Sequence, residues 1–548
     1  MPIIRLAMAQ SNPVVGDFEG NVAAILKLVA DAAAQGANMV QFGEMSITGY
    51  PVEDLVTRKS FVAKATEKIS QLASELVAKG FGEIAVVVGA PALAVVPNGW
   101  AIATNTAYVL HQGKVLATYN KHHLPNYSVF DEYRNFVPGH ASGVFEFQGV
   151  TCGLAICEDI WQEGGPVAEL SKHSVQLTLV LNGSPFEIDK DDRRLQLVRS
   201  LAAKQSTAVS YVNLVGGQDD LVFDGDSLFV TKSGELIARG AQFTEDLVLV
   251  DFDGQSATLV SDHVQTKADD NWQAWNALVL GLRDYVQKNG FKSVVLGLSG
   301  GIDSAVVATI ASDAIGGQNV YGISMPSRYS SDHSKGDAEQ LAENLGCHYQ
   351  TVAIESMVSA FEGALDLNDL AGENLQARMR GVILMAQSNN FGHLTLTTGN
   401  KSELAVGYST IYGDSVGGFA PLKDVEKTFV WELARWRNAF AESNGETAPI
   451  PQNSISKPPS AELRPGQVDQ DSLPDYDVLD AILDAYVEKR LGLEEIVAKG
   501  FDRELVTRVL GLVDRAEWKR RQGAIGPKIT GMAFGRDRRL PITNRYKG

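Results

Sequence analysis

A strand, a glycine-rich turn and a helix meet within residues 295–304. These ten residues are Val-Leu-Gly-Leu-Ser-Gly-Gly-Ile-Asp-Ser, and the first half is an apolar run typical of a buried strand. A helical pattern follows at 305–311. Such a turn aims backbone N–H groups and a helix N-terminus at a phosphate, and its glycines let the main chain approach the anion closely. The segment therefore predicts a phosphate-binding loop.

An aspartate stands where the common phosphate loop has a lysine. That loop requires Lys directly after its last glycine, whereas Gly301 is followed by Ile302 and Asp303. A carboxylate in this place suits a pyrophosphate that is bridged by Mg²⁺. The pattern S-G-G-x-D-S resembles the pyrophosphatase loop of enzymes that transfer AMP from ATP and release pyrophosphate. The alternative is a turn that binds nothing, and the flanking strand and helix disfavour it.

Three reactive side chains follow three separate predicted strands in the first half of the chain. They are Glu44 after 39–42, Lys121 after 114–120 and Cys157 after 151–156. Layered α/β domains assemble sites at strand ends. A cysteine nucleophile needs its thiolate, which a carboxylate generates as base and a nearby ammonium favours. The set is sufficient to attack an amide. Spacing alone leaves open a buried cysteine and two surface charges, and Cys152 in mid-strand is predicted to be such a buried cysteine.

The segments around these residues resemble the nitrilase superfamily. The matching segments are 43–51 (GEMSITGYP), 120–125 (NKHHLP) and 153–161 (GLAICEDIW). The resemblance implies that Glu44 is the base, that Lys121 supports the tetrahedral intermediate and that Cys157 is the nucleophile. It also implies an α-β-β-α sandwich for this half. Glu132 falls where that family often has a supporting second carboxylate.

The composition limits the classes of protein that this chain can represent. The 548 residues are 45% hydrophobic and 21% charged, which predicts a soluble globular protein of two or more domains. A formal net charge of −18 disfavours nucleic acid and acidic membranes as partners. Three cysteines in so long a chain indicate a reducing compartment. The first ten residues are typical of a strand and not of a signal peptide. We therefore expect a cytoplasmic protein without a membrane partner.

Strands and helices alternate in both halves, which predicts an α/β fold throughout. We expect the first domain at 1–251, a linker at 252–270 where periodicity is lost, and a second domain at 271–548. The predicted strands of the second domain begin at 293, 320, 348 and 394 and alternate with helices. This order predicts a doubly wound, Rossmann-like parallel sheet that binds a nucleotide at its carboxyl edge.

Several other features of the second half suggest a site. Glu403 follows the last predicted strand and would share Mg²⁺ with Asp303, although a helix N-terminus alone also explains a glutamate there. Six prolines in 449–474 suggest a lid or an interface arm. Residues 515–548 contain ten Lys and Arg against two Asp and Glu, which predicts either a solvated tail or a phosphate-binding one.

A nitrilase-type half joined to an S-G-G-x-D-S half resembles the glutamine-dependent NAD⁺ synthetases over essentially the whole chain. The resemblance implies a glutaminase that works through a thioester on Cys157. It also implies adenylation of deamido-NAD⁺ by ATP with Mg²⁺, and displacement of AMP by ammonia. Residues carried over by motif are Tyr127, Ser184 and Lys190 for glutamine; Gly297, Leu298, Ser299, Gly300, Gly301, Ile302, Asp303, Ser304 and Thr398 for ATP; Asn374, Glu403 and Lys519 for deamido-NAD⁺; and Asp303 and Glu403 for the metal. Glu403 therefore has two candidate roles.

One departure from the ammonia-only relatives is visible at Thr410-Ile411-Tyr412-Gly413-Asp414, where they usually have Lys at the second position. Ammonia released into water becomes ammonium, which cannot attack an acyl-adenylate, so we expect an enclosed passage between the two sites. Such a passage needs a fixed interface, which homo-oligomers commonly supply. Asparagine and GMP synthetases remain rivals, but the former use an N-terminal Cys and the chain has Pro2. A tRNA-thiolating enzyme and a non-catalytic scaffold are further alternatives.

Overall fold

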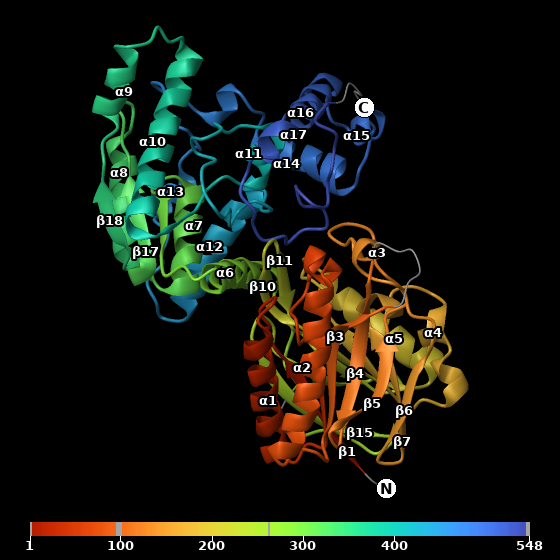
Figure 1. The fold of residues 1–548 in the computed structure, drawn as a ribbon. Helices are drawn as coiled ribbons and strands as arrows, with labels where there is room; N and C mark the ends of the chain where they lie inside the picture. The colour runs from red at the N-terminus through yellow and green to blue at the C-terminus, as the bar shows by residue number, and fades with distance from the viewer. Residues whose placement is uncertain (1–2, 95–100, 261–263, 544–548) are drawn as a thin grey trace. The chain divides into compact units, whose positions relative to one another are not determined.

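The protein forms two compact units in a computed structural model that describes residues 3–94, 101–260 and 264–543 (Figure 1). The first unit comprises residues 1–218 and 222–270, and the second comprises 219–221 and 271–548. The range 252–270, expected as a linker, belongs to the first unit. It contains a short strand, β15 (Ala257–Leu259), that pairs with β14 (Asp246–Phe252). Residues 261–263 of that range lie outside the described residues.

Two β-sheets face each other in the first unit. The seven-stranded sheet has the order β15, β14, β1 (Ile4–Gln10), β2 (Met39–Phe42), β3 (Ala85–Leu93), β4 (Ala103–His111) and β5 (Lys114–Asn120). The six-stranded sheet has the order β13 (Leu236–Arg239), β12 (Leu228–Val230), β9 (Ala208–Asn213), β8 (Leu177–Asn182), β7 (Val150–Ile156) and β6 (Gly143–Phe147). A separate hairpin consists of β10 (Val215–Gln218) and β11 (Leu221–Asp224).

Strand β1 shows why these residues form a layered structure. Its side chains alternate between two cores: Leu6 and Met8 belong to the core between the sheets, whereas Ala7 and Ala9 belong to the core beneath the helices. Successive side chains of a strand point to opposite faces, so a strand that is covered on both faces is apolar throughout. The continuous apolar run of β1 follows from this double burial.

Helices cover the outer faces of both sheets in this unit. Helices α1 (Phe18–Ala34) and α2 (Lys59–Ala78) pack on the seven-stranded sheet. Helix α5 (Lys190–Gln205) packs on β9 and β12 of the other sheet. The shorter elements are η1 (Glu53–Thr57), α3 (Glu132–Asn135), η2 (Cys157–Ile160), α4 (Gly165–Ala168) and η3 (Leu170–His173). The predicted α-β-β-α sandwich is confirmed.

Four parallel strands form the sheet of the second unit, as predicted. Their order is β18 (His348–Thr351), β17 (Val320–Ser324), β16 (Val294–Gly297) and β19 (Leu394–Thr395). The chain runs outward from β16 to β18 and then returns to the other side of β16. The carboxyl ends of β16 and β19 therefore flank the point at which the strand order reverses, where nucleotides bind in such sheets.

Helices make up most of the rest of the second unit (Figure 1). Those in the sheet-bearing part are α6 (Asp270–Lys288), α7 (Ile302–Ile315), α8 (Asp332–Leu345), α9 (Glu355–Glu362), α10 (Asp369–Phe391), α11 (Lys401–Val406), α12 (Lys427–Ser443) and α13 (Gln452–Ser456), with η4 (Gly317–Asn319) and η5 (Asp469–Asp471). The remaining helices are α14 (Tyr476–Leu483), η6 (Asp484–Glu488), α15 (Leu493–Val497), α16 (Arg503–Arg515) and α17 (Glu517–Arg520). Among the described residues, no helix has the length and hydropathy to cross a membrane.

Candidate active sites

Glu44, Lys121 and Cys157 lie together at the ends of β2, β5 and β7. The Lys121 Nζ atom is 2.8 Å from Glu44 Oε1, and the side chains of both residues are fully buried. The charges of Glu44 and Lys121 both act on Cys157, whose exposed fraction is 6%. Three strand ends in two different sheets thus supply a thiol, a carboxylate and an ammonium to one point.

A second carboxylate completes this buried cluster. Glu132 Oε2 lies 2.9 Å from Lys121 Nζ, and the Tyr50 hydroxyl donates to Glu132 Oε1 at 2.8 Å. Burial raises the pKa of Glu132 to about 7, although the Lys121 ammonium opposes the shift. Burial also disfavours the charge on Lys121, but Glu132 and Glu44 outweigh it and raise the pKa of that lysine well above its usual value. The two carboxylates therefore favour the charged ammonium form of Lys121.

Cys157 is held as a thiol by its surroundings. Burial raises the pKa of the Cys157 thiol well above its usual value, Glu44 raises it further, and Lys121 acts in the opposite direction. A thiol of this kind needs a base to become a nucleophile, and Glu44 is the neighbouring carboxylate. The backbone of Cys157 has φ of +41°, in the left-handed region. Such strain is uncommon for a residue with a side chain and is often stored at functional sites.

The residues that are expected to bind glutamine lie around this cluster. Two glutamates that the sequence analysis did not single out lie beside them. The Tyr127 hydroxyl donates to Glu158 at 2.9 Å, and Tyr127 also lies within electrostatic range of Cys157 and Glu187. Lys190 Nζ is 3.3 Å from Glu187 Oε1. Ser184 is buried, and its backbone N–H donates to Asn213 at 2.9 Å. Glu158 and Glu187 are acidic groups near the expected substrate contacts. Glu158 directly follows Cys157 and Glu187 lies three residues after Ser184, which is the only signal of them in the sequence.

Cys152 is buried in the core between the two sheets, as predicted. Burial raises the pKa of its thiol, and the Sγ atom contacts the carbonyl oxygen of Val150 at 3.7 Å. It therefore behaves as a small apolar side chain.

A cavity of about 270 Å³ opens at the carboxyl end of the sheet in the second unit. Residues of the predicted phosphate loop that line it are Gly297, Leu298, Ser299, Gly301, Ile302, Asp303 and Ser304, joined by Thr398 and Glu403. Gly300 has φ of +75°, and a Cβ atom there would lie 2.2 Å from the carbonyl oxygen of Ser334. Only glycine fits this turn, which brings the loop's main chain to the cavity and the start of α7.

Two carboxylates converge on one cation position in this cavity. Lys427 Nζ lies 2.5 Å from Asp303 Oδ2 and 3.2 Å from Glu403 Oε1. Burial raises the pKa of Glu403 to about 8, and Asp303 adds to the shift while Lys427 opposes it. The described residues contain no group of three or more metal-ligating side chains. Asp303 and Glu403 would therefore supply two carboxylate ligands to Mg²⁺. Two protein ligands suit an ion that takes its other ligands from phosphates and water.

Known proteins match this chain over its whole length. The carbon-nitrogen hydrolase family matches residues 5–261, and the NAD synthase family matches residues 274–523. The glutamine-dependent NAD(+) synthetase of Acinetobacter baylyi is 45% identical, over 100% of this chain and 99% of its own. That of Thermotoga maritima is 42% identical over the full length of both. The chain belongs to the glutamine-dependent NAD⁺ synthetases.

Solved structures agree with this assignment. The synthetase of Acinetobacter baumannii, determined in complex with ADP, has a TM-score of 0.77 and 43% identity, with 99% of both chains covered. The synthetase of Cytophaga hutchinsonii has a TM-score of 0.83 at 23% identity, which shows the shared fold. The two units of this synthetase therefore correspond to the two halves that its sequence resembles.

Asn374 and Lys519, expected to contact the dinucleotide, both hold the loop 407–410 of this synthetase. Asn374 Oδ1 accepts from the Thr410 hydroxyl at 2.7 Å. Lys519 Nζ donates to the carbonyl oxygens of Gly407 and Ser409, each at 2.8 Å. Tyr408 and Thr410 in this loop line the cavity, whereas Asn374 and Lys519 are not among its lining residues. These two side chains thus contact the loop that contributes Tyr408 and Thr410 to the cavity lining.

The proline-rich segment 449–474 lies over the phosphate loop. The Ser454 hydroxyl donates to the carbonyl oxygen of Gly300 at 3.1 Å, and Lys457 Nζ donates to Ser334 at 2.7 Å. Residues 457–463 contribute much of the cavity lining. Lys427, Lys457 and Arg380 are cations at this cavity that sequence reasoning missed, because none belongs to a glycine-rich or strand-end motif.

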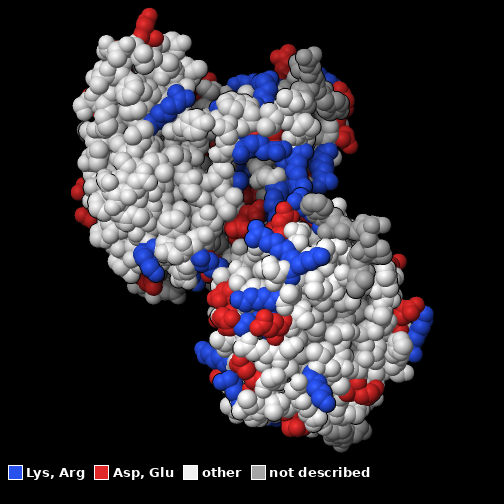
Figure 2. Space-filling model, viewed as in Figure 1, with Lys and Arg blue, Asp and Glu red and all other residues white. Residues whose placement is uncertain are grey.

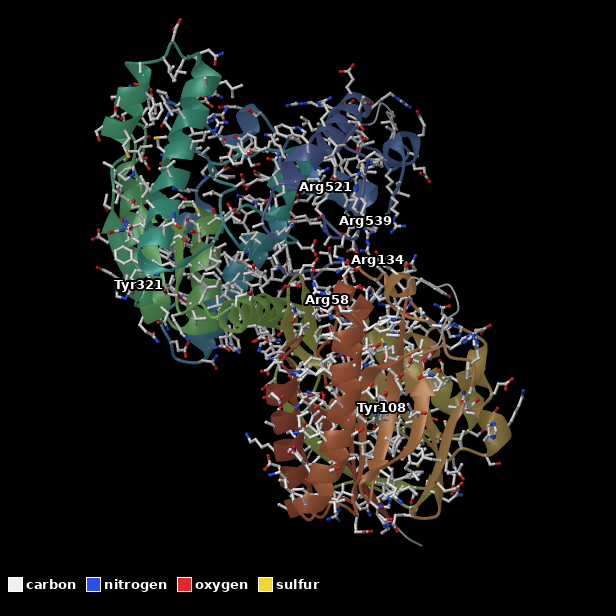
Figure 3. All side chains as sticks on the ribbon, in the orientation of Figure 1. Arg58, Tyr108, Arg134, Tyr321, Arg521 and Arg539 are labelled. Atoms are coloured by element: carbon white, nitrogen blue, oxygen red, sulfur yellow. The ribbon has the colours of Figure 1, made fainter. Side chains whose placement is uncertain are left out.

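Internal contacts occupy much of the basic C-terminal region. Arg520 pairs with Glu517 at 2.9 Å, and its guanidinium lies 4.6 Å from the centroid of the Phe534 ring. Arg521 also pairs with Glu517, at 2.7 Å; it is labelled with Arg539 in Figure 3. Part of the positive charge of this region is thus paired with Glu517 or packed against an aromatic ring. Residues 544–548 of the predicted tail lie outside the described residues.

Proposed function

We propose that this chain converts deamido-NAD⁺ into NAD⁺, with glutamine as nitrogen donor and ATP as the source of AMP. One observation carries the proposal: a buried Glu–Lys–Cys cluster and an S-G-G-x-D-S cavity occur in one chain that matches named synthetases along its full length. The products are NAD⁺, glutamate, AMP and pyrophosphate. The proposal is tested by incubating the protein with glutamine, ATP, Mg²⁺ and deamido-NAD⁺. Formation of ADP in place of AMP would contradict it.

Ammonia is produced at the buried cluster. Glu44 takes the proton of Cys157, and the Sγ atom attacks the amide carbon of glutamine. The Lys121 ammonium stabilises the negative charge on the oxygen of the tetrahedral intermediate. Glu44 returns the proton to the leaving nitrogen, and ammonia departs as the thioester forms. Water activated by Glu44 then releases glutamate and restores the thiol. Tyr127, Ser184 and Lys190 hold the glutamine in this scheme.

The cavity of the second unit supports the adenylation. The substrate carboxylate attacks the α-phosphorus of ATP, pyrophosphate leaves, and ammonia then displaces AMP from the acyl-adenylate. The loop 297–304 and Thr398 cradle the phosphates with backbone N–H groups and hydroxyls. Asp303 and Glu403 would hold Mg²⁺, which neutralises phosphate charge when it is bound. In that state the Lys427 ammonium is free to contact a phosphate oxygen.

Replacing Lys519 tests how the dinucleotide end of the cavity is built. Lys519→Ala removes two hydrogen bonds from a charged donor, each worth about 1.5–3 kcal/mol. We expect the KM for deamido-NAD⁺ to rise about tenfold or more and the KM for ATP to change little. The reason is that the substitution frees loop 407–410 from Lys519 and leaves the phosphate loop unchanged. Lys489→Ala removes a surface pair with Asp484 and serves as the control. Equal changes in both KM values would contradict this assignment.

We also propose that the protein is a cytoplasmic homo-oligomer. All three cysteines are free thiols, which suits a reducing compartment. Large apolar side chains are exposed along α9 and α10, including Val382 (58%), Met385 (37%) and Phe391 (66%). Figure 2 shows few charged side chains over these helices. A second copy of this acidic chain would meet little like-charge repulsion on such a face.

Charged residues on α10 test the association. Val382→Glu combined with Met385→Glu should lower the molar mass measured by light scattering to that of a smaller species, because carboxylates would be buried in the interface. Val77→Glu on α2 is the control, since Val77 is similarly exposed at 49%. An unchanged mass for the double variant would exclude this face as the interface.

A further inference from the structure

Arg194 in α5 is a fully buried arginine beside the cluster that contains Cys157. Its Nη1 atom donates to both carboxylate oxygens of Asp224, at 2.8 and 2.6 Å. Its Nη2 atom donates to the carbonyl oxygens of Ser184 and Pro185, each at 3.1 Å. Both Arg194 and Asp224 are 0% exposed. Burying such a pair removes hydration from two charges, so stability alone is a weak reason for its presence.

The backbone of Ser184 is held from a second side as well. Its N–H donates to Asn213 Oδ1 at 2.9 Å, and its carbonyl oxygen accepts from Asn213 Nδ2 at 3.1 Å. Asn213 Nδ2 also lies 3.3 Å from Asp224 Oδ1. Side chains from α5 and β9 therefore fix both backbone polar groups of Ser184, and Asp224 joins the two side chains.

This fixed segment touches Glu44 through the preceding residue. The Gly183 N–H donates to Glu44 Oε2 at 3.0 Å. The other oxygen, Oε1, accepts from Lys121 at 2.8 Å and from Asn105 at 2.6 Å. Gly183 thus donates the hydrogen bond that orients Oε2. Because one peptide bond joins Gly183 to Ser184, the position of Ser184 determines that of Gly183. A shift of Ser184 would move Gly183 away from Glu44.

We propose that Arg194 is a positioning residue for amide cleavage: held by Asp224, it fixes the carbonyls of Ser184 and Pro185 and thereby sets the Gly183 N–H against Glu44. This inference rests on the proposed glutaminase function. Arginine suits the task because its planar fork donates to a carboxylate with one nitrogen and to two carbonyls with the other. A lysine ammonium in its place keeps the charge beside Asp224 but lacks the fork.

Arg194→Lys is the test, with both nitrogen sources assayed on the same preparation. We expect kcat for glutamine-driven NAD⁺ synthesis to fall about 10- to 100-fold, because a displacement of about 1 Å at a reacting group costs up to about a hundredfold. Synthesis from ammonium salt should stay within about twofold, since it does not use this unit's chemistry. A lower folded fraction would reduce both rates equally. The ratio of the glutamine-driven to the ammonium-driven rate therefore measures the effect on the glutaminase site. We expect kcat to change more than the KM for glutamine.

Two further variants make the result decisive. Arg5→Lys is the matched control, because Arg5 also pairs with a carboxylate (Asp251, 2.8 Å) and a carbonyl (Gln35, 3.0 Å) that are outside the site. If Arg194→Lys does not fold, Asp224→Asn serves as the test in its place. This variant keeps the shape of the side chain beside Arg194 and should lower the same ratio. An unchanged ratio in the folded Arg194 or Asp224 variant would overturn the inference. Absence of glutamine-driven synthesis in the unaltered protein would instead overturn the proposed function.

Discussion

Cys157→Ala is expected to abolish glutamine-driven NAD⁺ synthesis and to leave synthesis from ammonium salt at raised pH intact. Ala removes the Sγ atom that would form the thioester, and no other residue of the cluster can replace a thiolate in that step. Removing a catalytic nucleophile costs several orders of magnitude in rate. The buried Glu44–Lys121 pair remains, so the unit should stay folded. The measurement is NAD⁺ formed per minute from each nitrogen source.

Cys152→Ala on the same strand is the matched control. Cys152 is fully buried in the core between the sheets, so this variant should lose stability and keep both activities. Glutamine activity in the Cys157 variant would contradict the assignment of the nucleophile. Loss of ammonia activity in a folded Cys157 variant would show that the two halves are not separable catalysts.

Asp303→Asn is expected to abolish NAD⁺ formation from both nitrogen sources. The substitution removes the negative charge that faces Lys427 at 2.5 Å and that would help hold Mg²⁺ on the phosphates. Loss of the metal's charge stabilisation is worth several kcal/mol, which is about a thousandfold or more in rate. The measurement is pyrophosphate release with saturating ATP, because it follows adenylation directly and does not depend on the nitrogen source.

Asp313→Asn gives the control for this effect within the same helix. Asp313 pairs with Arg437 at 2.8 Å and accepts from the Trp275 indole, and it does not line the cavity. This variant should lower the melting temperature and keep pyrophosphate release near normal. Near-normal release by the Asp303 variant would show that the loop does not bind ATP in the way proposed.

Local sequence determined the positions that carry the proposed chemistry. Each of Glu44, Lys121 and Cys157 follows a short run of strand-forming residues, so the strand ends could be located without the fold. The loop 297–304 requires glycine where its backbone turns beside Ser334. The opposite fates of Cys152 and Cys157 follow from one being inside a strand and the other at its end. The parallel sheet followed from the alternation of strands and helices.

The tertiary structure alone decided which groups face these positions. Lys427 lies 124 residues from the Asp303 that it contacts, and Glu462 contacts Ser334 across 128 residues. Lys519 holds two carbonyl groups of a loop 110 residues or more before it. Arg194 reaches Asp224 and Ser184 only because α5 packs on the sheet that contains β9. Contacts of this kind arise because polar groups in the folded interior must find hydrogen-bond partners, and no local pattern of residue types encodes those partners.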